Sequence, residues 1–199
     1  MPRNRWQISF NTDIKNRYGD KANADRCLGS LISATRAVTN CRASWAETAA
    51  LVADQLTLHL PGPEILTADQ RYGDPAAYCC HLFHAEPDGS FSVVALVWRP
   101  GQATPIHDHV TWCVFGVIQG TEREERHVLR DDGWLEQDGV SVNARGEVAS
   151  LAPPGDIHRV RNAGEQTAIS LHVYGTDISR LGSSVRRIYD LPVVAKMSG

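Results

Sequence analysis

The spacing of apolar residues divides the chain into a helical first third and a β-rich remainder. In segments 25–38 and 43–60, apolar side chains recur every three or four residues, the period of a helix buried along one side. Ser44 followed three residues later by Glu47 matches a capping box, which predicts the start of the second helix. Prolines follow this run, and residues 63–72 can hold one further short helix.

From residue 78 the pattern changes to that of short strands. Two β-rich runs flank a Glu-Pro-Asp-Gly turn at residues 86–89. Runs rich in strand-forming residues, each bounded by Gly, Pro, Asp or Asn, lie at 78–85, 91–98, 112–119, 123–129, 147–151, 158–161 and 168–174. Short strands at such spacing are typical of a small antiparallel barrel or jelly roll. We therefore expect a mainly β fold with the N-terminal helices packed outside one barrel.

Length and charge narrow the class of protein. A chain of 199 residues is long enough to bury a full core. We expect a single domain over residues 1–199, mostly helical over 1–75, with the β-barrel core at 76–190. The net charge of −3 gives no reason to expect nucleic acid or an anionic membrane as partner. No apolar run approaches the roughly 20 residues of a membrane span.

Cysteine usage and the N-terminus bear on the compartment. The first residues lack the apolar segment and cleavage site of a signal peptide. Five scattered cysteines without metal-finger spacing suit a reducing environment: Cys27, Cys41, Cys79, Cys80 and Cys113. We expect a cytoplasmic protein.

Three histidines stand in a pattern that fits a metal site. His107 and His109 are one residue apart, so on a strand their side chains share a face. His158 follows a Gly- and Pro-rich turn and begins a later strand. Neutral imidazoles suit iron, zinc, copper and nickel alike, so the residue types leave the metal open. The pattern predicts a site formed by these three histidines.

A second group of polar residues lies on the last predicted strand of the barrel. Ser170, His172 and Tyr174 alternate, so their side chains face the same way. The Ser170 hydroxyl can orient His172, which can orient the phenol of Tyr174. We expect a relay that ends close to the metal, and the alternative is a strand with exposed polar residues.

The two histidine segments resemble the two motifs of the cupin barrels. The positions of the first motif are filled by Gly101, His107, His109 and Gly120, except that its glutamate is replaced by Cys113. The positions of the second motif are all filled, by Pro153, Gly155, His158 and Asn162. The resemblance implies a cupin fold for the β-rich part of the chain.

With the Ser-x-His-x-Tyr strand, these motifs resemble the thiol dioxygenases, which comprise cysteine dioxygenase and bacterial enzymes acting on 3-mercaptopropionate. The resemblance covers about residues 78–189. It implies one Fe(II) held by three histidines, with O2 as co-substrate and a small thiol oxidised to its sulfinate. A third histidine in place of the usual carboxylate leaves a more positive centre, which should favour a thiolate ligand. Tyr174, positioned by His172 and Ser170, would form a hydrogen bond with the bound oxygen or with the substrate.

The resemblance leaves the thiol open. Cysteine dioxygenases hold the substrate carboxylate with the arginine of a Tyr-x-Arg pattern, and the 3-mercaptopropionate enzymes tend to place glutamine there. Here that position is Cys80, which matches neither. Arg186 and Arg187 match an arginine pair of the bacterial relatives, and we expect one of them to anchor a carboxylate. The alternative for this pair is a solvated basic turn.

Cys113 carries a further hypothesis. It lies four residues after His109, so on an unbroken strand it would share the face of the ligands. In animal cysteine dioxygenases a cysteine at the matching place forms a thioether with the tyrosine that corresponds to Tyr174. The same crosslink is the hypothesis here, and a buried cysteine that serves only as a small apolar residue is the alternative.

Two other functions stay open at this stage. One is a cupin enzyme of another substrate class that uses zinc or nickel, against which the missing glutamate and the Ser-His-Tyr strand argue. The other is a cupin that binds a metal or small ligand without turnover. A small-molecule thiol is the expected partner, while the oligomeric state is left open, and no basic or helix-turn-helix segment supports DNA binding.

Overall fold

The computed structural model describes residues 12–195, with side chains from residue 20 onward. The helices are α1 (Thr12–Thr39), α2 (Trp45–His59), η1 (Pro63–Ile65), α3 (Ala68–Tyr72) and α4 (Ile178–Leu181). The strands are β1 (Cys79–Ala85), β2 (Ser92–Trp98), β3 (His107–His109), β4 (Cys113–Gln119), β5 (Thr121–Leu129), β6 (Leu135–Ala144), β7 (Val148–Leu151), β8 (His158–Asn162), β9 (Ala168–Tyr174), β10 (Val185–Ile188) and β11 (Val193–Ala195). The first residues, on which the expectation of no signal peptide depends, lie outside the described residues.

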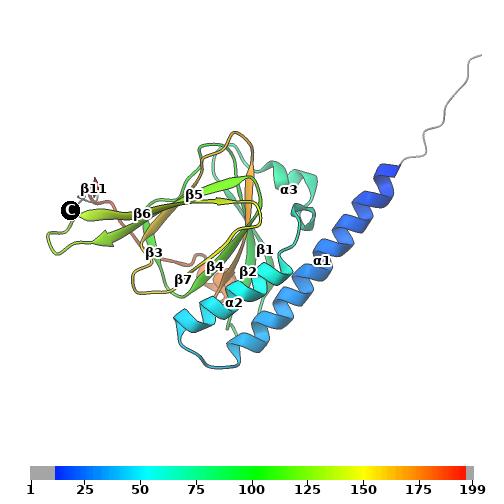
Figure 1. The fold of residues 1–199 in the computed structure, drawn as a ribbon, viewed down its shortest axis with the longest axis horizontal. Helices are drawn as coiled ribbons and strands as arrows, with labels where there is room; N and C mark the ends of the chain where they lie inside the picture. Colours follow the sequence, from blue (N-terminus) through cyan, green and yellow to red (C-terminus); the bar gives the residue numbers. More distant parts are fainter. Residues whose placement is uncertain (1–11, 196–199) are drawn as a thin grey trace, which may run out of the picture.

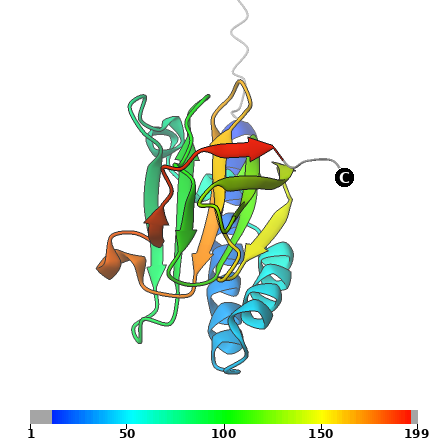
Figure 2. The ribbon, with the colours of Figure 1, turned by 90° about the vertical axis from the view of Figure 1, so that its left-hand side faces the viewer.

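The strands form two sheets. One has the order β1-β2-β9-β4-β7 and the other the order β10-β3-β8-β5-β6-β11. All pairings are antiparallel except that of β11 with β6. Helices α1 and α2 lie together along one side of the barrel, and β11 lies at the end far from α1 (Figures 1 and 2). The prediction of a mainly β fold with helices outside is confirmed.

The five-stranded sheet is covered on both faces. On one face, alternate residues of β2 and β9 such as Val93 and Leu171 pack with Leu31, Val52 and Leu56 of the helices. The other residues of the same strands face the second sheet and form the barrel interior. Because both faces are covered, β2 and β9 are buried along their whole length. Strand β2 is a nearly continuous apolar run, whereas β9 alternates apolar side chains with Ser170, His172 and Tyr174.

The elements differ from the predicted ones mainly at their ends. The capping box at Ser44 is present and begins α2. Helix α1 begins at residue 12, whereas the predicted helix began at 25. The pattern missed the first half of this helix because that half is mostly polar and has no apolar period. The sequence pattern also missed β6, whose side chains alternate between half-buried and exposed and carry few apolar residues.

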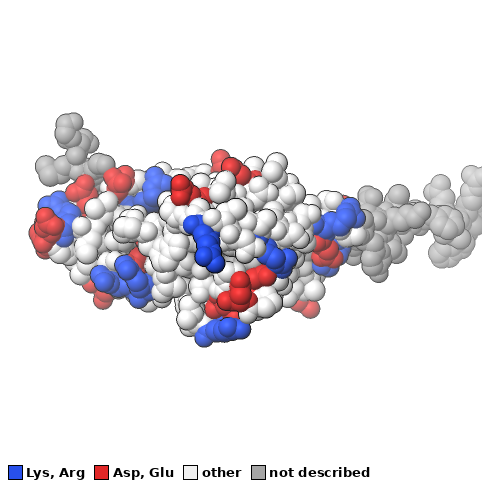
Figure 3. All heavy atoms as spheres, turned by 90° about the horizontal axis from the view of Figure 1, so that it is seen from below, with Lys and Arg blue, Asp and Glu red and all other residues white. Residues whose placement is uncertain are grey.

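The charged side chains on one face of the molecule show no strong asymmetry. On the face drawn in Figure 3, basic and acidic residues are interspersed, and neither sign gathers into a patch. Among the described residues, no helix has the length and apolar character that crossing a membrane requires.

Candidate active site

Three histidines converge inside the barrel. His107 and His109 come from β3, and His158 begins β8, where it pairs in register with His107. All three are buried, and one ligand nitrogen from each lies within 4.8 Å of the others. Their ring centroids are 4.7–5.0 Å apart. The two strands thus bring together residues that are about fifty positions apart in the sequence.

Each of these rings is held through its Nδ1 atom. In His107 the Nδ1 atom lies 3.0 Å from a backbone carbonyl two residues earlier. His109 Nδ1 lies 3.0 Å from Asp156 Oδ2, and His158 Nδ1 lies 2.7 Å from Glu124 Oε1. An N–H donated at each Nδ1 leaves the Nε2 lone pair of every ring free for a metal. Three neutral nitrogen donors in one buried site fit a divalent transition metal.

The two carboxylates alter the charge expected of the site. Burial would raise the pKa of Glu124 and Asp156, but the hydrogen bonds and charges of their histidines outweigh it and leave both pKa values lowered. Burial, with repulsion from its neighbours, lowers the pKa of His107 to about 3, so its ring is neutral. The positive centre expected from three neutral ligands is therefore partly offset by two ionised carboxylates behind the ligands.

The residues of β9 form one hydrogen-bonded chain. Ser170 Oγ lies 2.8 Å from His172 Nε2, and His172 Nδ1 lies 3.3 Å from Tyr174 Oη. Burial lowers the pKa of His172 to about 3 and raises that of Tyr174, so both are neutral. The Tyr174 ring lies 6.3 Å from the ring of His109. The chain of hydrogen bonds thus leads from the barrel interior to the ligand histidines.

Cys113 belongs to the five-stranded sheet and faces the barrel interior, opposite the sheet that carries the three histidines. The prediction of an unbroken strand from His109 to Cys113 is wrong, because β3 and β4 belong to different sheets. Instead, Cys113 begins β4 and lies opposite Tyr174 in the pairing of β4 with β9. Its Sγ is 3.7 Å from His172 Nδ1, and burial raises the pKa of its thiol. Cys113 and Tyr174 are therefore cross-strand neighbours inside the barrel.

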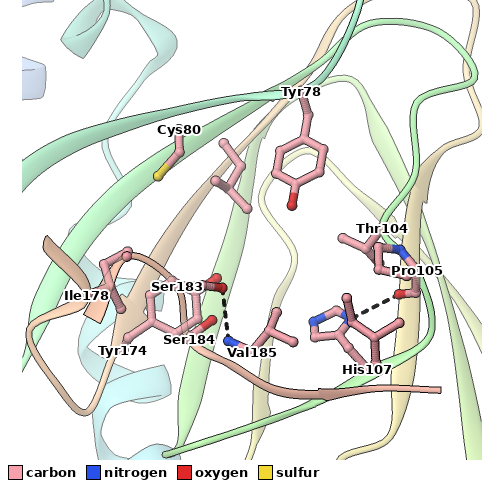
Figure 4. A pocket seen from close by; sticks show the side chains of 13 residues that line it. Tyr78, Cys80, Thr104, Pro105, His107, Tyr174, Ile178, Ser183, Ser184 and Val185 are labelled. Carbon is pink, nitrogen blue, oxygen red and sulfur yellow. Dashed lines mark hydrogen bonds between the residues drawn. The ribbon is translucent and has the colours of Figure 1, made fainter. Parts of the chain in front are cut away.

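Two adjoining cavities surround these groups. The inner one, of about 30 Å³, is bordered by the three ligand histidines together with Cys113, His172 and Tyr174. The outer one, of about 480 Å³, shares His107 and Tyr174 with it and is shown in Figure 4. In that view the phenol of Tyr78 points into the outer cavity. The three histidines therefore lie beneath a cavity large enough for a small organic molecule.

The outer cavity has no charged wall. Its polar lining consists of hydroxyl groups, the Cys80 thiol and His107, and its apolar lining includes Leu96, Ile178 and Val185. The hydroxyl groups belong to Tyr78, Thr104, Tyr174, Ser183 and Ser184. Among the described residues, no Lys, Arg, Asp or Glu borders this cavity. Cys80 does border it, as the sequence suggested, but brings no charge.

The two arginines expected to anchor a carboxylate have other partners in the structure. Arg186 Nη2 lies 2.5 Å from Asp108 Oδ2 and is about half exposed. Arg187 lies 5.4 Å above the ring of Tyr189. Asp108 alternates with the ligand histidines on β3, so it faces away from the metal site and draws Arg186 with it. Neither arginine borders the outer cavity.

Several groups at the site were missed by the sequence reasoning. Asp156 stands two residues before His158 within the Pro-x-Gly-Asp-x-His segment, so the motif itself could have pointed to it. Glu124 carries no such signal, because only the pairing of β5 with β8 brings it to His158. The hydroxyls of Ser183 and Ser184 lie in a loop that no periodicity describes.

Comparisons with known proteins add independent findings. A sequence model of the family described as cysteine dioxygenase type I matches residues 71–183. Cysteine dioxygenase type 1 of Danio rerio is 30% identical over 94 residues, which are 45% of this chain and 47% of that protein. The chain thus spans about half the length of this curated relative.

Solved structures show a weaker likeness. A Klebsiella pneumoniae protein with a double-stranded β-helix domain is 19% identical, with a TM-score of 0.45, over 57% of this chain and 90% of that chain. A cupin 2 conserved barrel domain protein from Salinispora arenicola is 18% identical, with a TM-score of 0.40, over 53% of this chain and 80% of that chain. Likeness at this level has no bearing on function.

Proposed function

The chain belongs to the cysteine dioxygenase type I family, and on that premise we propose that it is a non-haem Fe(II) thiol dioxygenase. The proposed reaction oxidises a small thiol with O2 to its sulfinate. The observation that carries the proposal is the set of three buried histidines with free Nε2 atoms beside the Ser170–His172–Tyr174 chain.

Iron is proposed from the dioxygenase family, because the three histidines alone would suit several divalent metals. His107, His109 and His158 would hold the metal, and Asp156 and Glu124 would fix the orientation of two of the rings. When bound, Fe(II) would supply the redox chemistry that joins O2 to a thiolate. The negative charges of the two carboxylates behind the ligands would partly offset the positive charge of the metal, so an anionic thiolate would bind less tightly than at a site without them.

The chain's own residues would hold and orient the thiol. The inner cavity is too small for more than the reacting groups, so the remainder of the substrate would lie in the outer cavity. There Tyr78, Ser183 and Ser184 offer hydroxyl groups, and Ile178 and Val185 offer apolar contacts. The phenol of Tyr174, which borders both cavities, would form a hydrogen bond with the reacting end of the substrate. Such fixed groups replace a random encounter by an oriented one.

Oxygen uptake tests the proposal. We expect the Fe(II)-loaded protein to consume O2 with at least one of cysteine, 3-mercaptopropionate, mercaptosuccinate or cysteamine, and to form the sulfinate. His107→Ala should abolish uptake, because it removes a ligand. His59→Ala, a matched loss of a histidine on α2 away from the site, should retain it. An iron-replete protein that consumes no O2 with any of these thiols would contradict the proposal.

The lining of the outer cavity predicts how the tail of the thiol is selected. Because no described Lys or Arg borders it, a carboxylate tail has no charged partner there. We expect 3-mercaptopropionate and the neutral 3-mercaptopropanol to have kcat/KM values within about tenfold of each other. A preference of more than about a hundredfold for the acid would contradict this expectation.

A further inference from the structure

One buried carboxyl group is not used by the site described above. Glu122, at the start of β5, is fully buried and projects into the barrel interior. Neither of its carboxyl oxygens completes a hydrogen bond with any group in the described part of the chain. Burial of a carboxylate without partners is costly, so such a residue in the core needs an explanation.

The surroundings of Glu122 connect it to the hydrogen-bonded chain of β9. Ser170 of β9 and Trp98 of β2 lie close enough to favour its charged form. Burial outweighs them and, with repulsion from Glu124, raises the pKa of Glu122 to about 7. The flanking strands place two neutral amides opposite it, those of Asn143 on β6 and Asn162 on β8. The titratable groups that face it are therefore another acid and the relay itself.

Ser170 is the only one of these neighbours that can pass on a proton. The Trp98 indole only donates, and its Nε1 lies 3.3 Å from Ser170 Oγ. Ser170 carries one hydrogen, which it can give either to His172 Nε2 or to Glu122. When it gives the hydrogen to Glu122, His172 carries its own hydrogen on Nε2 and Tyr174 donates to His172 Nδ1. When it gives the hydrogen to His172 Nε2, His172 donates from Nδ1 and Tyr174 donates into the cavity.

We infer that Glu122 is the terminal proton acceptor of the Tyr174–His172–Ser170 chain and takes up the proton of an incoming thiol. This inference rests on the proposed function. Glu122 does not touch the substrate, so it acts as a positioning residue that sets the direction of the hydrogen bonds. Its own proton exchange with the cavity can run only through Ser170 among the described neighbours, since its side chain is fully buried.

The proton balance of this step closes without a further reactant. The S–H bond of the thiol breaks and its proton goes to Tyr174 Oη, while the proton of Tyr174 goes to His172 Nδ1. The proton on His172 Nε2 goes to Ser170, and that of Ser170 goes to the Glu122 carboxylate. The result is a thiolate in the cavity and a neutral Glu122. Tyr174 and Ser170 each end with one proton as before, while His172 stays neutral but changes from the Nε2–H to the Nδ1–H tautomer. Once the cavity has emptied, the same shift in reverse returns the proton to water. An acceptor that titrates near neutral pH suits this task.

The first test compares how kcat/KM of wild type and of Glu122→Gln varies with pH. Glu122→Gln keeps the shape of the side chain but cannot accept a proton. We expect kcat/KM of the variant to fall by about 100-fold at about pH 8 and to approach the wild-type value below about pH 6, where Glu122 is already protonated. Glu125→Gln removes a carboxylate from the other face of the same strand and should leave the profile unchanged. A constant ratio of Glu122→Gln to wild type across this range would overturn the inference.

A second measurement needs neither iron nor turnover. Infrared difference spectra of the metal-free protein should show the carbonyl band of a buried protonated carboxyl that disappears near pH 7 in wild type and is absent from Glu122→Gln. In these spectra Ser170→Ala should keep a carboxyl band. In the separate activity assay of the iron-loaded protein, the same variant should lose the pH-dependent part of the activity. A Glu122 that is ionised, or protonated, over the whole range from about pH 5 to pH 9 would overturn the inference. If wild type oxidises no thiol, the proposed function fails, while the infrared band still reports on Glu122.

Discussion

Each ligand histidine is oriented by what accepts the hydrogen bond from its Nδ1 atom. His107 uses a backbone carbonyl, whereas His109 and His158 use buried carboxylates. A carboxylate behind a metal-bound imidazole raises the basicity of the ring and fixes its plane. The metal affinity of the protein should therefore depend on residues that do not touch the metal.

Replacement of Glu124 by Gln tests this dependence. The amide oxygen of Gln can still accept from His158, but the negative charge is lost. We expect Fe(II) or Zn(II) affinity to fall by about 10- to 100-fold, as measured by competition with a chelator of known affinity. Glu125→Gln, whose side chain pairs with Arg159 on the outer face, is the control. Equal affinity in wild type and Glu124→Gln would show that the carboxylate has no such role.

The raised pKa of Glu122 predicts how stability varies with pH. Below its ordinary value of 4.5 the carboxyl is protonated in both folded and unfolded chains. Between that value and about 7 the unfolded chain loses the proton while the folded one keeps it, so rising pH favours unfolding. We expect the unfolding free energy of Glu122→Gln to gain about 3 kcal/mol over wild type between pH 4.5 and pH 8, measured by urea denaturation. A difference that stays constant with pH would mean that burial does not raise this pKa.

The cross-strand pair of Cys113 and Tyr174 predicts a covalent change. If the hypothesis of a thioether is right, the Cys113 S–H and a ring C–H of Tyr174 are lost with O2 as oxidant, and the intact mass falls by two hydrogens after turnover. Cys113→Ala should show no change in mass under the same conditions. A wild-type mass that is unchanged after many turnovers would leave Cys113 as a free buried thiol.

The packing of α2 on the five-stranded sheet depends on one glycine. A Cβ atom on Gly116 of β4 would lie 2.7 Å from Leu60 Cδ1 and 3.2 Å from Leu56 Cδ2. We expect Gly116→Ala to lower the unfolding free energy by about 1–3 kcal/mol, because the packed side chains of Leu56 and Leu60 would have to shift. Gly29→Ala on the exposed side of α1, where a Cβ meets nothing within 4 Å, should instead raise it by about 0.5–1 kcal/mol. Denaturant titrations of both variants compare them, and similar effects of the two would contradict this packing.

The elements that sequence reasoning identified are those whose own residues carry a period or a cap. The capping box at Ser44 and the apolar runs of β2 and β9 are examples. Strand β3 has only three residues, two of them histidines, and its strand character comes from the pairing with β8 and β10. Strand β10 is mostly exposed, and it exists because it pairs with β3. Local pattern has no means to detect elements that owe their form to a distant neighbour.

The same limit applies to the site as a whole. The three histidines and the Ser-His-Tyr strand could be predicted from spacing and resemblance, because the histidines lie in two motifs and the other three residues lie on one strand. The position of Arg186 could not, since it depends on a charge partner on the outer face of β3. Nor could the position of Glu124, which only the pairing of β5 with β8 brings to His158, or that of Glu122, which meets Ser170 only when the two sheets face each other. Groups that the second sheet brings in thus complete the site.

The barrel joins these parts into one proposed activity: a three-histidine metal site, a relay from the opposite sheet and an outer cavity for the tail of a thiol. The most direct test of that activity is mass spectrometry of the product formed under ¹⁸O2 by the Fe(II)-loaded protein with the thiol that it consumes fastest. We predict a sulfinate in which both oxygen atoms on sulfur are ¹⁸O. A disulfide, or a product with one labelled oxygen or none, would contradict the assignment as a thiol dioxygenase.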